Sequence, residues 1–133
     1  IRCLLIIRIM TQEDKELLIK DLCGRLPYGV KVQYEDGIFD IDNISSIYEE
    51  IKLDTVDNYT IDISEIKPYL FPLSSMTEEQ KREYAHIVVM SGNIATLQLT
   101  GMTVQDWFSK NHFDYRGLIP MGLAIDATDK NIY

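Results

Sequence analysis

The first clear pattern of apolar and polar residues in the chain is helical. Thr11 is followed three residues later by Asp14, the layout of an N-terminal cap, and acids occupy the first turn. Apolar residues then recur every three or four positions, at Leu17, Leu18, Leu22 and Cys23. Gly24 favours the left-handed conformation that ends a helix, so we predict a helix over residues 12–23.

Two more helices are predicted from similar start signals. Thr77 and Gln80 form a capping box, which predicts a helix that continues to Gly92-Asn93. Its expected inner stripe consists of Tyr84, Ile87, Val88 and Ser91. Thr103, with Asp106 three residues later, opens a short helix that reaches about Asn111 and carries Trp107 and Phe108.

Alternation with a period of two predicts the strands. They are expected over residues 30–34, 38–42, 48–56, 59–64, 94–100 and 121–125. Turns are expected at Glu35-Asp36-Gly37 and at Asp57-Asn58. Pro68 and Pro72 argue against a central strand between them, so this piece is expected to be an extended connector.

The order of these elements predicts the fold class. Strands cluster first and helices bracket them, which indicates an α+β domain: a small antiparallel β-meander or partly open barrel flanked by two to three helices. The 133 residues suffice for one core, so residues 10–133 are expected to form a single domain. Residues 1–9 precede Met10 and are either an N-terminal extension or an edge strand. Their apolar run is too short to span a membrane, and no cleavage site follows it.

Charge separates the middle of the chain from the rest. The net charge is −8, which disfavours direct binding to nucleic acids or to an anionic membrane. Residues 35–65 alone contain ten acids and one base, so nearly all of the acidic excess lies there. If strands 38–42 and 59–63 are neighbours, Asp40, Asp42 and Asp62 share one solvated face. That face would bind a basic protein groove or a divalent cation weakly, or would simply keep the sheet edges soluble.

The residues that could carry catalytic chemistry are few. Cys3 and Cys23 have no partner at metal-ligand spacing, and two cysteines suit a reducing cytoplasm. His86 lies beside the inner stripe of the second helix, where a structural role is expected. No cofactor-binding or metal-binding motif occurs, so we predict no catalytic residue, metal or cofactor.

A cluster near the end of the chain is the best candidate for ligand binding. An imidazole, a carboxylate, a phenol and a guanidinium occur within five residues, at His112, Asp114, Tyr115 and Arg116. Arg116 could bind a phosphate in bidentate fashion, with Tyr115 or Trp107 stacking on a base. The alternative is a tight turn in which Asp114 accepts backbone N–H groups and Arg116 pairs with an acid of the sheet.

Several segments together support a resemblance. They are Asp106-Trp107-Phe108 and the stretches 10–18, 26–31, 67–70, 74–79 and 112–119. With these segments the chain resembles a group of small uncharacterised proteins encoded by gut-bacterial phages and prophages, over residues 10–127. The resemblance implies a cytoplasmic accessory protein in an infected or lysogenic bacterium, with counter-defence as its expected role, and it brings no known activity.

The expected function is therefore that of a non-enzymatic binding protein. Its partner would be a host protein, blocked by the acidic surface, or a small nucleotide immune signal, held near Arg116 in a pocket shared by a homo-oligomer. A small metal-assisted hydrolase or nuclease that uses His112 and Asp114 is the first alternative. A virion or assembly component is the second.

Overall fold

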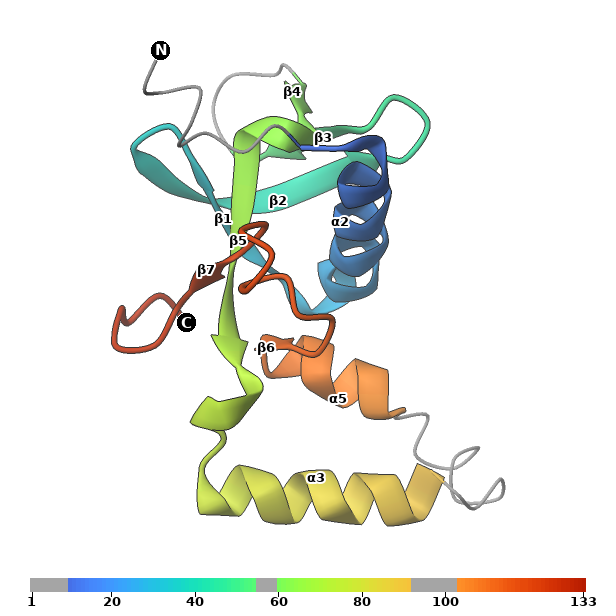
Figure 1. Cartoon of the computed structure of the whole chain (residues 1–133), viewed down its shortest axis with the longest axis vertical. Helices are drawn as coiled ribbons and strands as arrows, with labels where there is room; N and C mark the ends of the chain where they lie inside the picture. Colours follow the sequence, from blue (N-terminus) through green and yellow to red (C-terminus); the bar gives the residue numbers. More distant parts are fainter. Residues whose placement is uncertain (1–9, 55–59, 92–102) are drawn as a thin grey trace.

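The computed structural model describes residues 10–54, 60–91 and 103–133 (Figure 1). Its helices are α2 (Gln12–Arg25), α3 (Glu78–Ser91) and α5 (Val104–Lys110). Its strands are β1 (Lys31–Tyr34), β2 (Gly37–Ser45), β3 (Glu50–Leu53), β4 (Ile61–Asp62), β5 (Ile66–Pro72), β6 (Phe113–Asp114) and β7 (Ile125–Asp126). The predicted α+β class is confirmed.

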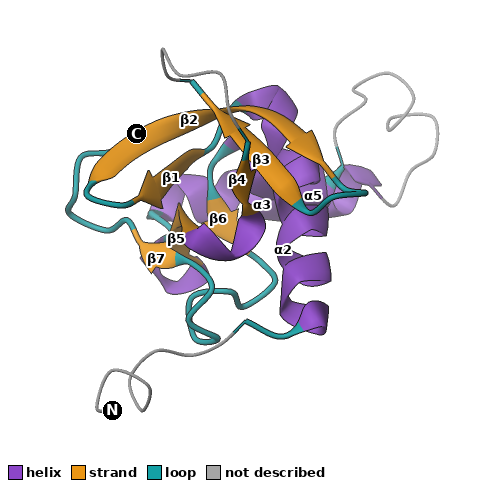
Figure 2. Cartoon of the chain, turned by 90° about the horizontal axis from the view of Figure 1, so that it is seen from above, coloured by secondary structure: helices purple, strands orange, loops and turns teal. Residues whose placement is uncertain are grey.

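One open sheet unites the strands, in the order β4-β3-β2-β1-β5-β6, with β7 also paired to β5. The first four strands form an antiparallel meander, and β1 pairs antiparallel with β5. Seen from above, β2 arches across the molecule beside β1 and β3 (Figure 2). β6 and β7 join β5 in parallel, so the sheet does not close into a barrel.

Two apolar clusters hold the described parts together. The larger cluster packs Leu18 and Leu22 of α2 against sheet residues such as Val32 and Ile51, all of them buried. The second cluster is aromatic and lies around α5, where Trp107, Phe108 and Phe113 are buried and α3 packs against them. α3 forms the lower end of the molecule in Figure 1, next to α5.

The predicted start of the first helix is confirmed, but its end differs. The hydroxyl oxygen of Thr11 accepts the N–H of Asp14 at 3.1 Å, and the carboxylate of Asp14 accepts the N–H of Thr11 at 3.3 Å. The helix continues through Gly24 to Arg25 and passes into a 3₁₀ turn over Leu26–Tyr28. The left-handed glycine is Gly29, with φ +83°, so the stop signal lies five residues after the one predicted.

The starts of α3 and α5 also agree with the capping predictions. Thr77 and Gln80 exchange reciprocal hydrogen bonds at 2.9 and 3.1 Å, and Thr103 and Asp106 do the same at 3.2 and 3.0 Å. On α3, Tyr84 and Ile87 pack against the aromatic cluster. The predicted helix end at Gly92-Asn93 and the predicted strand over 94–100 lie outside the described residues.

The expected connector between Pro68 and Pro72 is a central strand, β5, so that expectation is wrong. The first half of β5 pairs with β1, as far as Val32 opposite Pro68. From Tyr69 onward, β5 pairs with β7 through Tyr69 and Leu70 and then with β6 through Phe71 and Pro72. Because one proline lies where the pairing changes and the other ends the strand, neither interrupts a continuous ladder.

The remaining predicted strands are shorter or longer than expected. β2 continues to Ser45 across an irregularity between Ile41 and Asn43. After β4 the chain turns at once, because the carboxylate of Asp62 accepts the N–H of Ser64 and caps a 3₁₀ turn. The expected strand 121–125 is reduced to the two residues of β7, and the turn at Asp57-Asn58 lies outside the described residues.

Candidate functional site

Asp114, one of the predicted ligand-binding residues, is buried at the end of β6. Its Oδ1 accepts the N–H of Leu118 at 2.8 Å, and its Oδ2 accepts the N–H of Ile119 at 2.9 Å. Both carboxylate oxygens therefore close the turn that follows β6. This is the capping role that the sequence offered as the alternative to ligand binding.

Arg116 contacts both its neighbour Tyr115 and the buried Asp21 of α2. Arg116 Nε donates to Asp21 Oδ1 at 3.2 Å, and its Nη2 donates to the Tyr115 hydroxyl at 3.0 Å. The Arg116 guanidinium carbon lies 4.8 Å from the centre of the Tyr115 ring, a cation–π contact. Arg116 thus pairs with an acid on a helix, where the sequence had suggested an acid of the sheet.

Arg25 completes this buried ionic cluster. Its Nε donates to Asp21 Oδ2 at 2.7 Å, and its Nη2 donates to the carbonyl oxygen of Phe113 at 2.6 Å. The side chains of Arg25 and Asp21 are both fully buried. The atom Arg25 Nη1 has no hydrogen-bond partner among the described residues. Two guanidinium groups therefore share one buried carboxylate, and each helps to hold the segment 113–116 against α2.

Asp21 and Arg25 were not among the residues that the sequence predicted to form a site. The available signal was their spacing: an acid and a base four residues apart face the same side of a helix. They also follow Leu18 and Leu22 by three residues each, which places them next to the buried stripe. The contact with Arg116 had no local signal, because Asp21 and Arg116 are 95 residues apart in the chain.

His112 is held neutral between other side chains. Its ring stacks on Tyr133 at 3.6 Å between centroids, with the planes 11° apart. Burial first, and then the nearby charges of Arg25 and Lys31, lower the pKa of His112 to about 4. Its Nδ1 is buried and has no hydrogen-bond partner within the part of the chain that the structure describes. At neutral pH the imidazole is therefore uncharged and gives no attraction to a phosphate.

The five residues of the predicted ligand site are thus placed as follows. The structure brings Asp114, Tyr115 and Arg116 together with Asp21, stacks His112 on Tyr133, and buries Trp107 in the aromatic cluster, 5.6 Å from Phe113 between ring centroids. Within the described ranges, no group of three or more His, Cys, Asp or Glu side chains could hold a metal ion. Ligand binding at these residues stays a prediction.

The predicted acidic residues lie on the sheet, but not on neighbouring strands. β3 separates β2, which carries Asp40 and Asp42, from β4, which carries Asp62. Asp40 pairs with Lys31 at 3.1 Å, and Asp62 lies 3.8 Å from Lys15. A hydrogen bond from Ser64 is the main cause that lowers the pKa of Asp62.

Two further acids join them on the same side of β2, β3 and β4. Glu50 is paired directly with Asp62, and Asp54 donates its backbone N–H to the carbonyl oxygen of Asp40 at 2.8 Å. All of these acids alternate with buried aliphatic residues, so they point away from the core. We call this surface the acidic face; its acids are Asp40, Asp42, Glu50, Asp54 and Asp62, and Lys52 of β3 lies on the same side between Glu50 and Asp54.

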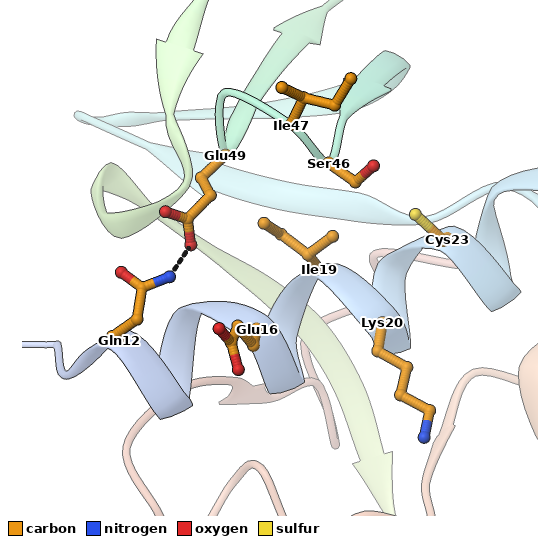
Figure 3. A pocket seen from close by; sticks show the side chains of 8 residues that line it. All are labelled: Gln12, Glu16, Ile19, Lys20, Cys23, Ser46, Ile47 and Glu49. Atoms are coloured by element: carbon orange, nitrogen blue, oxygen red, sulfur yellow. Dashed lines mark hydrogen bonds between the residues drawn. The ribbon is translucent and has the colours of Figure 1, made fainter.

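A groove of about 400 Å³ lies at the edge of this region, between α2 and the turn that joins β2 to β3 (Figure 3). Side chains from both elements point into it. We call it the α2 groove; it is lined by Gln12, Glu16, Ile19, Lys20, Cys23, Ser46, Ile47 and Glu49. At one end, Gln12 Nε2 donates to Glu49 Oε2 at 2.8 Å and ties the helix to the turn.

A smaller cavity, of about 240 Å³, lies beside the end of β5 and the start of α3. Phe71 and Phe113 line it together with polar residues at its mouth: Ser75, Thr77, Gln80, Thr128 and Asp129. Neither this cavity nor the α2 groove is lined by any of the five residues of the predicted ligand site.

Comparison with known proteins gives no relative from which a function could be taken. No protein-family model, curated protein or solved structure matches the chain. No helix in the described ranges is both long enough and apolar enough to cross a membrane.

Proposed function

We propose that this protein is a non-enzymatic binding protein whose acidic face blocks a basic surface of a partner protein. The observation that carries the proposal is the exposure of two carboxylates of the acidic face, Asp42 and Asp54. Both are exposed, and neither forms an ion pair with a described residue. Like charges at strand spacing repel one another, and a basic partner would relieve that repulsion.

The polar side chains of the predicted ligand site already form hydrogen bonds within the protein. This favours binding to a protein over catalysis or nucleotide capture. A nucleotide phosphate near Arg116 would compete with Asp21 and Tyr115 for the guanidinium. A general base at Asp114 would have to give up the backbone N–H groups that it holds. Asp42 and Asp54 of the acidic face, by contrast, form no ion pair with a described residue, so a partner can reach their carboxylates without breaking such a pair.

The resemblance to phage and prophage proteins supports a biological setting for this activity. In that setting the partner is a host protein in the cytoplasm of an infected bacterium, and blocking its basic surface counters a host defence. A basic surface on such a partner would serve nucleic-acid binding, which an acidic protein can occupy in place of the nucleic acid.

The test compares partner capture by three forms of the protein from a bacterial lysate, followed by direct binding to the purified partner. The first form is wild type, and the second carries Asp42→Lys and Asp54→Lys. The third is a matched control with two reversals on α3, Glu79→Lys and Glu83→Lys, which are exposed and lie outside the acidic face. All three should show the same circular dichroism spectrum and melting temperature.

We expect wild type and the α3 control to bind the same basic protein, with an affinity that falls steeply as salt rises. The Asp42→Lys, Asp54→Lys form should bind it at least about tenfold more weakly. Equal binding by all three forms would remove the acidic face from the proposal. A bound small molecule that leaves with Arg116→Ala, and no protein partner, would favour the nucleotide alternative.

A further inference from the structure

The α2 groove exposes apolar surface that the fold itself does not use. Ile47 is 85% exposed and its neighbour Tyr48 is 73% exposed, both in the turn between β2 and β3. Ile19, at the floor of the groove, is by contrast nearly buried. Aromatic and aliphatic side chains that stand at the rim of a groove are typical of surfaces that anchor another protein.

The charges around the groove are mainly negative. Glu16 and Glu49 line it and form no ion pair with a described residue, and Lys20 is the one basic residue among the described residues that line it. Glu50, which belongs to the acidic face, directly follows Glu49 in the chain, so a third carboxylate lies close to the groove at the start of β3. An occupant with positive charge would meet favourable potential along the whole of this edge.

The shape of the groove suits a short segment of protein chain. Its helical wall extends along α2 from Gln12 to Cys23, a length of about 16 Å at 1.5 Å per residue. This corresponds to about three turns of a second helix laid beside α2. The contact between Gln12 and Glu49 closes one end, so the segment would lie toward Cys23.

From these observations we infer that the α2 groove binds a basic amphipathic helix of the partner protein. Its apolar side would contact Ile19, Ile47 and Tyr48, and its lysines or arginines would face Glu16 and Glu49. The inference rests on the proposed function. The acidic face would contact the basic surface of the partner, and the α2 groove would bind a helix of the same partner.

Two other occupants suit the groove less well. A second copy of this chain would bring another net charge of −8 to a surface that is already acidic. An anionic membrane would be repelled for the same reason. The sign of the charge at this edge therefore selects a basic partner over both.

Cys23 provides a direct reporter of occupancy, because its thiol lines the groove and is exposed. The experiment uses the full chain with Cys3→Ser, so that Cys23 is its one thiol. The probe is a helical peptide of about twelve residues with leucines on one side and lysines on the other, which matches the length of the groove. The control peptide has the same composition with leucines spread around the helix.

We expect the first peptide to slow alkylation of Cys23 by iodoacetamide at least about fivefold, and the control peptide to leave the rate unchanged. Ile47→Ser should weaken peptide binding about tenfold, and Lys20→Glu, which adds an acid, should strengthen it. Both substitutions are on exposed side chains, so the fold should be retained. Equal protection by both peptides, or no effect of Ile47→Ser, would overturn the inference.

The purified partner separates this inference from the proposed function. If Asp42→Lys with Asp54→Lys weakens partner binding while Ile47→Ser does not, the groove inference fails and the acidic face stands. If Ile47→Ser weakens binding while the charge reversals do not, the acidic face fails. A wild-type dimer that Ile47→Ser converts to monomer in analytical ultracentrifugation would identify a second copy as the occupant and overturn the inference.

Discussion

His112 combines two features that make it a probe of the folded state. It lies in the left-handed region at φ +62°, and its half-buried imidazole is stacked on Tyr133. The pKa of His112 is about 4 in the folded protein, below its ordinary value of 6.5, because burial and the charge of Arg25 disfavour the imidazolium. The unfolded chain therefore binds this proton more tightly than the folded one does.

The sign of this difference fixes the pH dependence of stability. The contribution of His112 is fully present above about pH 6.5 and is lost as the pH falls toward about 4. His112→Asn should remove this dependence, since asparagine tolerates positive φ and does not titrate. Between neutral pH and pH 4, wild type should lose more stability than the variant in urea unfolding, by about 1 kcal/mol once solvent screening of this half-buried ring is allowed for. Parallel losses in the two proteins would contradict the assignment.

The buried ionic cluster predicts an order of destabilisation. Asp21→Asn leaves two guanidinium groups without their shared carboxylate, one of them fully buried, and should reduce the free energy of unfolding by about 3 to 5 kcal/mol. Arg116→Met removes the partly exposed partner and should cost only about 1 kcal/mol. Urea titration of both variants measures this order, and a reversed order would show that Arg116 stabilises the fold mainly through contacts other than Asp21.

For single residues, contacts with near neighbours in the chain were predictable from the sequence, whereas contacts with distant residues were not. The capping by Asp114 follows from its place before a turn with Gly117 and Pro120. The pairing of Arg116 depends on α2 and the segment after β6 meeting in space. Nothing within a few residues of either partner encodes that contact, so the sequence could only suggest an acid.

Among the elements, α5 depends most on its cap. It has seven residues, too few to be stable alone, yet it supplies Trp107 and Phe108 to the aromatic cluster. Thr103→Ala removes the side-chain acceptor for the Asp106 N–H and should lower the free energy of unfolding by about 1 kcal/mol. Thr103→Ser keeps an acceptor and should be near neutral. Equal losses for the two substitutions in thermal unfolding would show that packing of the threonine methyl matters more.

Element starts were predicted more reliably than element ends or roles. Threonine caps act through residues three positions away, so the starts of all three described helices agree with the sequence. The helix end predicted at Gly24 was wrong, because a glycine can remain inside a helix when tertiary contacts of the next residues stabilise it. Here those contacts are made by Arg25. The connector predicted between Pro68 and Pro72 was wrong, because these prolines lie where the pairing of β5 changes and where the strand ends. Those positions are set by the neighbouring strands and not by the local sequence.

For the whole molecule, the net charge of −8 predicts a response to salt. The acids of the acidic face repel one another across β2, β3 and β4, and mobile ions screen that repulsion. The melting temperature should therefore rise by a few degrees between about 10 mM and about 150 mM sodium chloride. Asp42→Lys should make the rise smaller, and the control Glu83→Lys should change it less. A melting temperature independent of salt would contradict strong repulsion on this face.

The meander was predictable as a whole because alternation marks each of its strands. The parallel additions were not, because β6 and β7 have two residues each and no period can be read from two positions. The α2 groove could not be predicted either, because it lies between one side of a helix and a turn more than twenty residues later in the chain. Of its two apolar rim residues, Tyr48 was predicted to begin a strand over 48–56, and Ile47 was assigned to no element.

The division of β5 into two halves has a consequence for local opening. Its first half belongs to the large cluster through β1, while its second half joins β6 and the aromatic cluster below. No described side chain of α3 is fully buried, so that helix can detach while the meander stays intact. Amide hydrogens of α3 should exchange with deuterium orders of magnitude faster than those of β1 and β2, and binding at the α2 groove should leave that difference unchanged.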